Sequence, residues 1–335
     1  MSDFTELVDL ASERLGGAVL YANDDFFAQK ENLLKPSAPV FIEGKYTDKG
    51  KWMDGWESRR RRTPGFDWCI IRLGLPGTIH GVIVDTSFFR GNYPEQCSLE
   101  ACAIDGNPDV ETLTSESIPW REVLPISDLK GDSRNPFTIQ KSDRVTHLRF
   151  KIFPDGGVAR LRVYGEVIPD WSALARRGEI DLAAVENGAR VLHCSDMFFG
   201  HLHNLIMPGR ALDMSDGWET KRRRGPGYDW AVIKLATSGE IRRVEIDTAH
   251  FKGNFPESCS LEACHTVDDV DTLAGISSLP WKELLPRTKL QAHTRHFYEE
   301  ELKASGSVTH VRFNIYPDGG VSRLRLYGTI GPDGT

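Results

Sequence analysis

The sequence predicts an all-β protein made of two similar β-sandwich domains, and three observations lead to this prediction. An internal duplication covers almost all of the 335-residue chain. Each copy contains several short runs rich in β-branched and aromatic residues, which favour strands. Segments rich in glycine and proline separate these runs, and few stretches have a helical pattern. We therefore expect a sandwich or jelly roll in each half of the chain.

The duplication is clearest in two fourteen-residue segments that are identical at eleven positions, FRGNYPEQCSLEAC from Phe89 and FKGNFPESCSLEAC from Phe251. Further matching pairs of segments begin at Asp54 and Asp216 and at Val145 and Val308. A repeat of about 165 residues has the size of a domain and is too long for a solenoid unit. The expected domains are residues 1–170 and 171–335.

The first elements of each copy are a helix and, in the first copy alone, an inserted loop. Residues 23–36 predict the helix, because a capping Asn23 begins the segment and a proline ends it. Matching residues lie 172 positions apart near the start, as Phe26 and Phe198 do, but 162 apart in the middle. The first copy therefore holds ten extra residues, near 40–51, which we expect to form a surface loop.

Strands are expected in the rest of each copy. Residues 66–75 and 79–89 are rich in β-branched residues, and the Pro-Gly pair at 76–77 breaks the pattern between them. Residues 97–102 predict a further strand with alternating side chains. Residues 145–165 predict a strand, a turn and a strand, because the central DGG supplies the positive φ angles of a tight hairpin.

Charge and hydropathy exclude several classes of partner. The formal net charge of −7 argues against nucleic acid, which requires a basic surface. No apolar run approaches the roughly 20 residues of a membrane span, so no membrane partner is expected. Residues 1–17 are acidic and lack the apolar segment of a secretory signal, so we expect a cytoplasmic protein.

The cysteines fit the same interpretation. None has the C-x-x-C spacing of a zinc site, and cytosolic conditions disfavour disulfides. We expect the six to be reduced and mostly buried: Cys69, Cys97, Cys102, Cys194, Cys259 and Cys264.

Three segments that each occur twice together resemble the allantoicase family. They are DGWE with the basic run after it, GNYPE or GNFPE with CSLEAC, and PDGGV with the arginine-rich strand after it. The resemblance covers essentially the whole chain, including the duplication. It implies two jelly-roll domains similar to galactose-binding modules. It also implies hydrolysis of allantoate to ureidoglycolate and urea in purine breakdown, and we expect a homo-oligomer without a cofactor.

Allantoate carries a carboxylate and two ureido groups on one carbon, so its site needs a guanidinium for the carboxylate and acceptors for the ureido N–H groups. The basic runs at 59–62 and 221–224 lie between acidic residues, which favours a pocket. A solvated or interface stripe is the alternative, because charge runs are usually exposed. The candidates for substrate binding here are Asp54, Arg60, Asp67, Asp216, Arg222 and Asp229, and those for catalysis are Glu57 and Glu219.

The strand VARLRVYG and its second copy add four arginines. Alternation puts Arg160 and Arg162 on one face and the apolar residues on the other, and Arg323 and Arg325 repeat the pattern. The arginine face is either part of the substrate-binding site or a subunit contact. Both interpretations stay open.

The CSLEAC segments add two catalytic candidates, Glu100 and Glu262, which point away from the apolar side of their strands. Each is either an acid or base or a member of a cross-strand salt bridge. Asn92 and Asn254, just before these segments, are expected to shape loops.

Metal chemistry has weaker support. The chain has ten histidines, but its close pairs, 201 with 203 and 293 with 296, have no counterparts in the first copy. We therefore assign no metal ligands, and leave open a divalent ion such as Mn²⁺ held by carboxylates.

Hydrolysis of allantoate does not require a nucleophilic side chain, and no G-x-S-x-G motif is present. The bond that breaks joins the aminal carbon to a urea nitrogen, so an acid, a base and an anion clamp suffice. Two alternatives remain: a non-catalytic tandem lectin-like module, and a hydrolase or lyase of another ureido acid. One copy or both could carry the activity.

Overall fold

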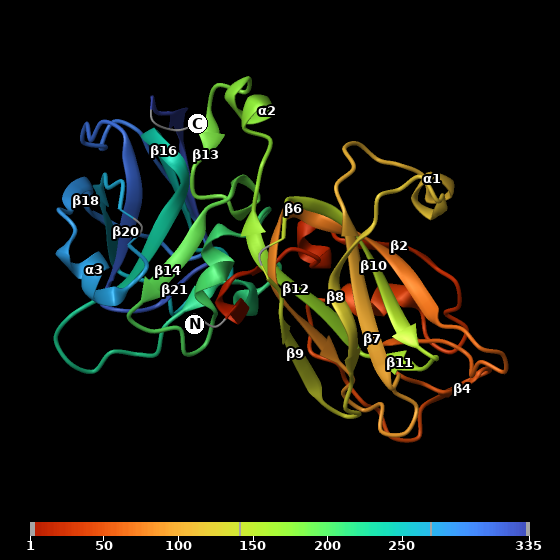
Figure 1. The fold of residues 1–335 in the computed structure, drawn as a ribbon. Coiled ribbons are helices and arrows are strands. Elements are labelled where there is room, and N and C mark those ends of the chain that lie inside the picture. The colour runs from red at the N-terminus through yellow and green to blue at the C-terminus, as the bar shows by residue number, and fades with distance from the viewer. Residues whose placement is uncertain (1–3, 141, 269, 333–335) are drawn as a thin grey trace. The chain divides into compact units, whose positions relative to one another are not determined.

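The computed structural model describes residues 4–140, 142–268 and 270–332. The chain divides into two compact units, Met1–Ile168 and Pro169–Thr335, and each contains one copy of the duplicated sequence. Figure 1 colours the first from red to yellow-green and the second from green to blue.

The first unit consists mainly of strands, and its helices are short. The strands are β1 (Val8–Asp9), β2 (Ala18–Ala22), β3 (Tyr46–Thr47), β4 (Gly50–Lys51), β5 (Trp56–Glu57), β6 (Asp67–Asp85), β7 (Gln96–Cys102), β8 (Arg121–Asp128), β9 (Arg134–Thr138), β10 (Val145–Phe153), β11 (Gly157–Val158) and β12 (Arg160–Val167). The helices are η1 (Phe4–Glu6), η2 (Glu13–Leu15), η3 (Lys30–Leu34) and α1 (Val110–Thr114).

The second unit has the same order of strands apart from the β3–β4 hairpin. Its strands are β13 (Ile180–Asp181), β14 (Arg190–Cys194), β15 (Trp218–Glu219), β16 (Asp229–Asp247), β17 (Ser258–Cys264), β18 (Lys282–Lys289), β19 (Arg295–Tyr298), β20 (Val308–Tyr316), β21 (Gly320–Val321) and β22 (Arg323–Ile330). The helices are α2 (Trp171–Ala175), η4 (Val185–Asn187), η5 (Leu202–Ile206), η6 (Met214–Asp216) and α3 (Leu273–Ser278).

One long strand organises each unit. The first half of β6 pairs with β2 and β10, and its second half pairs with β9 and β12. Gly77 is the point of exchange, since it is the register partner of both Val145 and Val167. A Cβ atom there would lie 2.1 Å from the carbonyl oxygen of Glu166, so the close approach requires glycine. The predicted break at 76–77 is wrong, because one continuous strand changes partners at this point.

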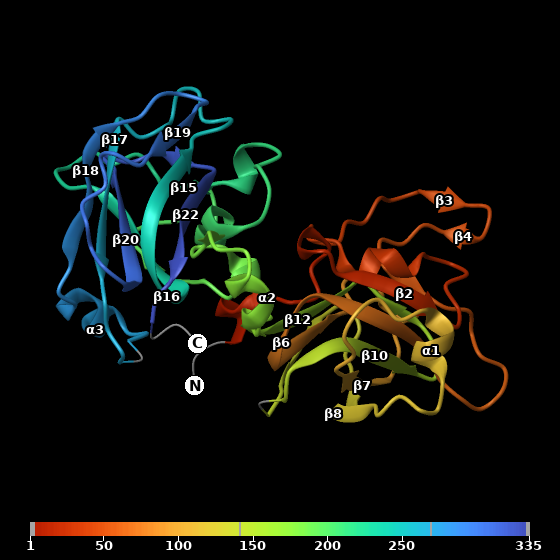
Figure 2. The ribbon, with the colours of Figure 1, turned by 90° about the horizontal axis from the view of Figure 1, so that it is seen from above.

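Two layers result from this exchange. In the first unit they are β2-β6-β10-β7-β8 and β1-β12-β6-β9. In the second unit β16 has the position of β6, with Gly239 at the exchange point, and Figure 2 shows β16 between β20 and β22. The predicted all-β fold of two jelly-roll sandwiches is confirmed.

The core of each unit lies between the layers. Leu161 and Val163 of β12 are fully buried, as the alternation predicts. Trp56 is also fully buried, with its ring centroid 6.2 Å from that of Phe150, and Trp218 of the second unit packs in the same way. These tryptophans anchor the short strands β5 and β15, so the glutamate that follows each one has a fixed position.

The ten-residue insertion lies at the surface, as predicted, and the structure shows that it contains a hairpin. β3 pairs with β4, and all four of their residues except Gly50 are exposed. Figure 2 shows this hairpin at the edge of the first unit. The predicted helix over 23–36 is wrong in extent, since only the five residues of η3 are helical. Ala28 pairs with Glu57 as an isolated bridge, which keeps the preceding segment extended.

The predicted hairpin around DGG is also wrong. β10 ends at Phe153, and the residues after the turn form β11, which pairs with β5. β12 then pairs with β6, so the two predicted hairpin strands never pair with each other. The turn thus carries the chain from one layer to the other.

All six cysteines are free and five of them are buried, as predicted. Burial raises the pKa of the Cys97 thiol to about 12, which makes it unreactive. Among the described residues, no helix has the length and apolar character needed to cross a membrane.

Candidate active site

The short strand β15 presents the central carboxylate of the candidate site. It pairs with β21, and Trp218 points into the core, so Glu219 points away from it. The side-chain amide of Asn254 donates a hydrogen bond of 2.5 Å to Oε1 of Glu219. The backbone N–H of Gly320 donates to the carbonyl of Asn254, so the DGG turn fixes this asparagine. The Glu219 carboxylate is thus bound by a neutral amide, in contrast to the ion-paired carboxylates elsewhere.

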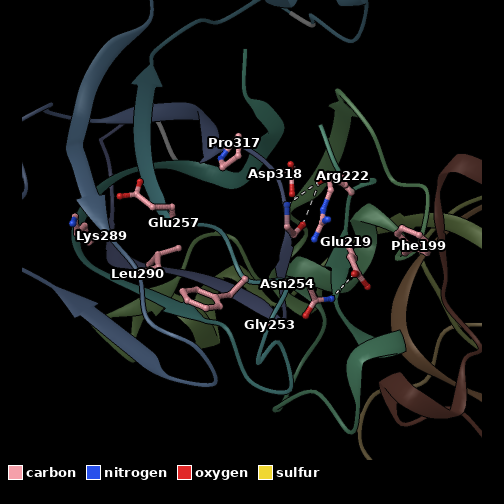
Figure 3. A pocket seen from close by; sticks show the side chains of 13 residues that line it. Phe199, Glu219, Arg222, Gly253, Asn254, Glu257, Lys289, Leu290, Pro317 and Asp318 are labelled. Atoms are coloured by element: carbon pink, nitrogen blue, oxygen red, sulfur yellow. Dashed lines mark hydrogen bonds between the residues drawn. The ribbon is translucent and has the colours of Figure 1, made fainter. Parts of the chain in front are cut away.

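Glu219 lines a pocket of about 550 Å³, called here the Glu219 pocket (Figure 3). It is formed by the loop before η5, by β15 and the basic run, by the GNFPE segment, by the end of β18 and by the DGG turn. Its lining residues are Phe199, Glu219, Thr220, Arg222, Gly253, Asn254, Phe255, Glu257, Lys289, Leu290, Pro317, Asp318 and Gly319.

The arginines of the basic run differ in their contacts. Arg223 forms an ion pair with the buried Asp229, and its backbone N–H donates to Asp318. Arg222 is exposed, lines the pocket and makes no ion pair within the described residues. In Figure 3 its guanidinium lies near Asp318 and on the same side of the pocket as Glu219. Arg222 is therefore the cation of this run that lines the pocket and can bind an anion there.

The first unit repeats this arrangement. Asn92 donates a hydrogen bond of 2.7 Å to Oε1 of Glu57, and burial raises the pKa of this carboxyl group against the weaker, lowering effect of Asn92. Arg61 forms an ion pair of 2.6 Å with Asp67, while its neighbour Arg60 is exposed. The duplicated segments thus build the same local geometry twice.

Four residues that were predicted to bind substrate lie outside the pocket. They form two ion pairs, one in each unit. Arg160 is only 1 % exposed and pairs with Asp54 at 2.7 Å. Its guanidinium also donates to the backbone carbonyls of Ser37, Asp54 and Ala159. Arg323 and Asp216 form the same pair in the second unit, at 3.0 Å. Burial alone would raise the pKa of Asp54, but the Arg160 hydrogen bond and charge bring it below its usual value.

The other two arginines of this face have a similar position. Arg162 donates to the carbonyls of Lys35 and Pro36 and lies 3.6 Å from the carboxylate of Asp9. Arg325 makes the corresponding contacts with residues 181, 207 and 209. These arginines hold the N-terminal segment of each repeat against the last strand. Their guanidinium groups therefore bind acceptors within their own unit.

The carboxylates of the CSLEAC strands form cross-strand salt bridges. Glu100 accepts hydrogen bonds of 2.5 Å from both Arg149 and Lys151 of β10. Burial would raise the pKa of Glu100, but these two cations hold it below its usual value. Glu262 pairs with Arg312 at 2.5 Å in the second unit. Of the two alternatives for these glutamates, the structure favours the salt bridge.

The described residues include no group of three His, Cys, Asp or Glu side chains able to hold a metal ion. The rings of His201 and His203 lie 4.7 Å apart, and His293 and His296 accept backbone N–H groups. Five polar residues that line the pocket were absent from the candidates predicted from the sequence: Asn254, Asp318, Thr220, Glu257 and Lys289. The first two had a usable signal, since GN-aromatic-P and PDGG occur in both copies.

Comparison with known proteins identifies the family to which the duplicated sequence is similar. Residues 8–168 and 180–331 match the family described as Allantoicase repeat. The chain is 50% identical to "Probable allantoicase 1" of Burkholderia mallei, over 96% of this chain and 94% of that protein. It is likewise 50% identical to "Probable allantoicase" of Pseudomonas fluorescens, over 98% and 97% of the two chains.

A solved structure extends the agreement to three dimensions. The crystal structure of allantoicase from Saccharomyces cerevisiae is similar with a TM-score of 0.80 and 38% identity, covering 96% of this chain and 93% of that one. The similarity therefore includes both copies of the duplicated fold. Together with the repeat and its segments, these matches show that the chain belongs to the allantoicase family of hydrolases.

Proposed function

We propose that this protein hydrolyses allantoate to ureidoglycolate and urea in the Glu219 pocket. The observation that supports this assignment most directly is the pairing, within one pocket, of an amide-bound carboxylate with an arginine that has no acidic partner among the described residues. The arginine can bind the substrate carboxylate, and the glutamate can move protons.

The chemistry needs few groups. Glu219 in its acid form gives a proton to one ureido nitrogen, and the lone pair of the other ureido nitrogen expels urea from the aminal carbon. Water then adds to the carbon of the resulting iminium ion, and the Glu219 carboxylate takes up the proton that the water loses, which regenerates the acid form. Arg222 holds the carboxylate throughout, while the oxygen atoms of Asp318 and Asn254 can accept ureido N–H groups. This route assigns no step to a cofactor or metal ion.

Substrate choice tests the proposal first. We expect purified protein to release urea from allantoate and to leave allantoin unchanged, because the closed ring of allantoin lacks the free carboxylate. In ¹⁸O-labelled water, cleavage at the aminal carbon places the label in the hydroxyl group of ureidoglycolate. Label in inorganic carbon, with release of ammonia, would mean attack on a ureido carbonyl and would reject the route.

Substitution of Glu219 tests the site. Glu219→Gln keeps the shape and one hydrogen-bonding oxygen but removes the acid, so kcat should fall about 100-fold or more. Glu240→Gln is the matched control, because Glu240 is an exposed strand residue whose carboxylate forms an ion pair with Arg242 alone among the described residues. Equal urea release by both variants would exclude Glu219 as the proton-transfer group.

Two properties beyond the reaction are also proposed. We propose self-association, because the second unit exposes large apolar side chains at Phe198, Phe199 and Leu212. Sedimentation of the purified protein measures the assembly state directly. We propose a cytoplasmic location, which the six free cysteines support.

A further inference from the structure

The two units have opposite charges at one position beside the pocket. Lys289 is the last residue of β18 and pairs in register with Ser258. Asp128 is the last residue of β8 and pairs in register with Gln96, the residue that corresponds to Ser258. The backbone bonds that follow are also the same, from Leu290 to Glu257 and from Leu129 to Glu95. The two side chains therefore occupy equivalent places with opposite charge.

We propose that Lys289 determines which copy of the site binds the anionic substrate, so that each chain has one productive site, in its second unit. This inference rests on the proposed hydrolysis of allantoate and names the residue that makes one copy selective for an anion. Lys289 acts as a specificity-determining residue, which adds a positive charge to the pocket that Arg222 already lines.

The balance of charge at the two copies supports this. The Glu219 pocket has three carboxylates and two cations, which are Glu219, Glu257 and Asp318 with Arg222 and Lys289. The corresponding first-unit positions have four carboxylates and one cation, which are Glu57, Glu95, Asp128 and Asp155 with Arg60. An anionic ligand is therefore repelled more strongly at the first copy.

A neighbouring arginine increases the difference in charge between the two copies of the site. Arg287 forms an ion pair of 3.2 Å with Glu257 and so offsets the negative charge at the rim of the Glu219 pocket. Ile126 occupies the corresponding position in the first unit and is exposed. Lys130 is the nearest additional cation in that segment, but its counterpart Gln291 does not line the Glu219 pocket.

The side chains of Asp128 and Lys289 also have different surroundings. Asp128 accepts a hydrogen bond of 2.8 Å from the Gln96 amide, which is a neutral group. Lys289 is exposed, and Figure 3 shows it with Glu257 and Leu290 on the side of the pocket opposite Glu219 and Arg222. A substrate in the pocket would therefore lie between two cations, and the flexible stem of a lysine can adjust to it.

Charge reversal at each copy tests the inference. Lys289→Asp should raise KM for allantoate about tenfold or more with little change in kcat, and Lys289→Ala should raise it about threefold to fivefold. Lys289→Arg should restore KM to near the wild-type value. The matched control is Asp128→Lys, which makes the opposite change on the equivalent strand and, because it adds positive charge to the first copy, should not raise KM.

The control measurements separate a binding effect from a structural one. Thermal unfolding should be the same for all these variants, because residues 128 and 289 are both exposed. The increase in KM for Lys289→Asp should shrink as salt is raised, since screening weakens the interaction of exposed charges.

The outcomes for the two proposals differ. If the wild type releases no urea from allantoate, the proposed function fails. If the wild type is active but Lys289→Asp has an unchanged KM, or Asp128→Lys changes KM as much as Lys289→Asp does, the proposed function stands and the single-site inference is overturned.

Discussion

Replacement of Arg160 by alanine tests whether the buried arginines stabilise the fold or bind substrate. The guanidinium donates hydrogen bonds of 3.0, 2.9 and 2.7 Å to the carbonyls of Ser37, Asp54 and Ala159, and one of 2.7 Å to the Asp54 carboxylate. Alanine would leave all four acceptors without this donor, and the carboxylate without its closest cation. Loss of one partner of a buried ion pair costs about 3–5 kcal/mol.

The expected effect is large enough to measure easily. A loss of about 4 kcal/mol corresponds to a decrease of roughly 8–16 °C in the unfolding temperature of a domain of this size. Calorimetry and urea unfolding followed by tryptophan fluorescence report it. Arg60→Ala is the control, because Arg60 is exposed and its loss should change the free energy of unfolding by less than about 0.5 kcal/mol.

The same experiment can refute the structural role. An Arg160→Ala protein that unfolds at the wild-type temperature but has lost urea release would return Arg160 to the substrate-binding group. An Arg160→Ala protein that unfolds at a lower temperature than the wild type, yet has normal kcat and KM when assayed well below that temperature, would support the structural role of Arg160.

Two further predictions concern the fold. Gly77→Ala should lower the unfolding temperature clearly, because the new Cβ would lie 2.1 Å from a backbone oxygen, whereas Gly91→Ala, with no atom within 4 Å, should not. Calorimetry of the two variants side by side measures the difference. Burial and the charge of Arg72 hold the pKa of His147 below its usual value, so the unfolded chain binds the proton more tightly. Stability should therefore fall as pH drops below about 6.5, by at most about 1.4 kcal/mol per unit from this residue, and His147→Gln should make urea-unfolding curves less dependent on pH.

Periodicity in the sequence predicted the strands well but could not predict their partners. The apolar alternation of residues 159–163 is right, since Leu161 and Val163 are buried in the core. The two strands predicted on either side of DGG also exist. Their pairing was wrong because β6 pairs with both, and a single strand long enough to serve two layers has the same local pattern as two short strands.

The site was harder to predict because exposure depends on distant segments. Alternation correctly put Arg160 and Arg162 on the side away from the core, and a solvent-facing arginine is a reasonable anion ligand. Residues more than 100 positions away cover this side: Ser37 and Asp54 contact Arg160, and Lys35 contacts Arg162. The roles within the basic run could not be predicted for the same reason. Only the structure shows that the side chain of Arg223 points inward while that of Arg222 faces the pocket.

Identity between the two copies does not by itself separate fold from function. Arg160 and its counterpart Arg323 are identical because each sandwich requires the same buried ion pair. Burial in the core does not explain why Glu57 and Glu219 are identical. Positions that differ are more informative when the surrounding geometry stays the same. At Asp128 and Lys289 the strand pairing and the next backbone hydrogen bond are alike, so the fold accepts either residue. A reversal of charge there changes only the electrostatic environment of the adjacent pocket, and this is the property that selection for an anionic substrate would act on.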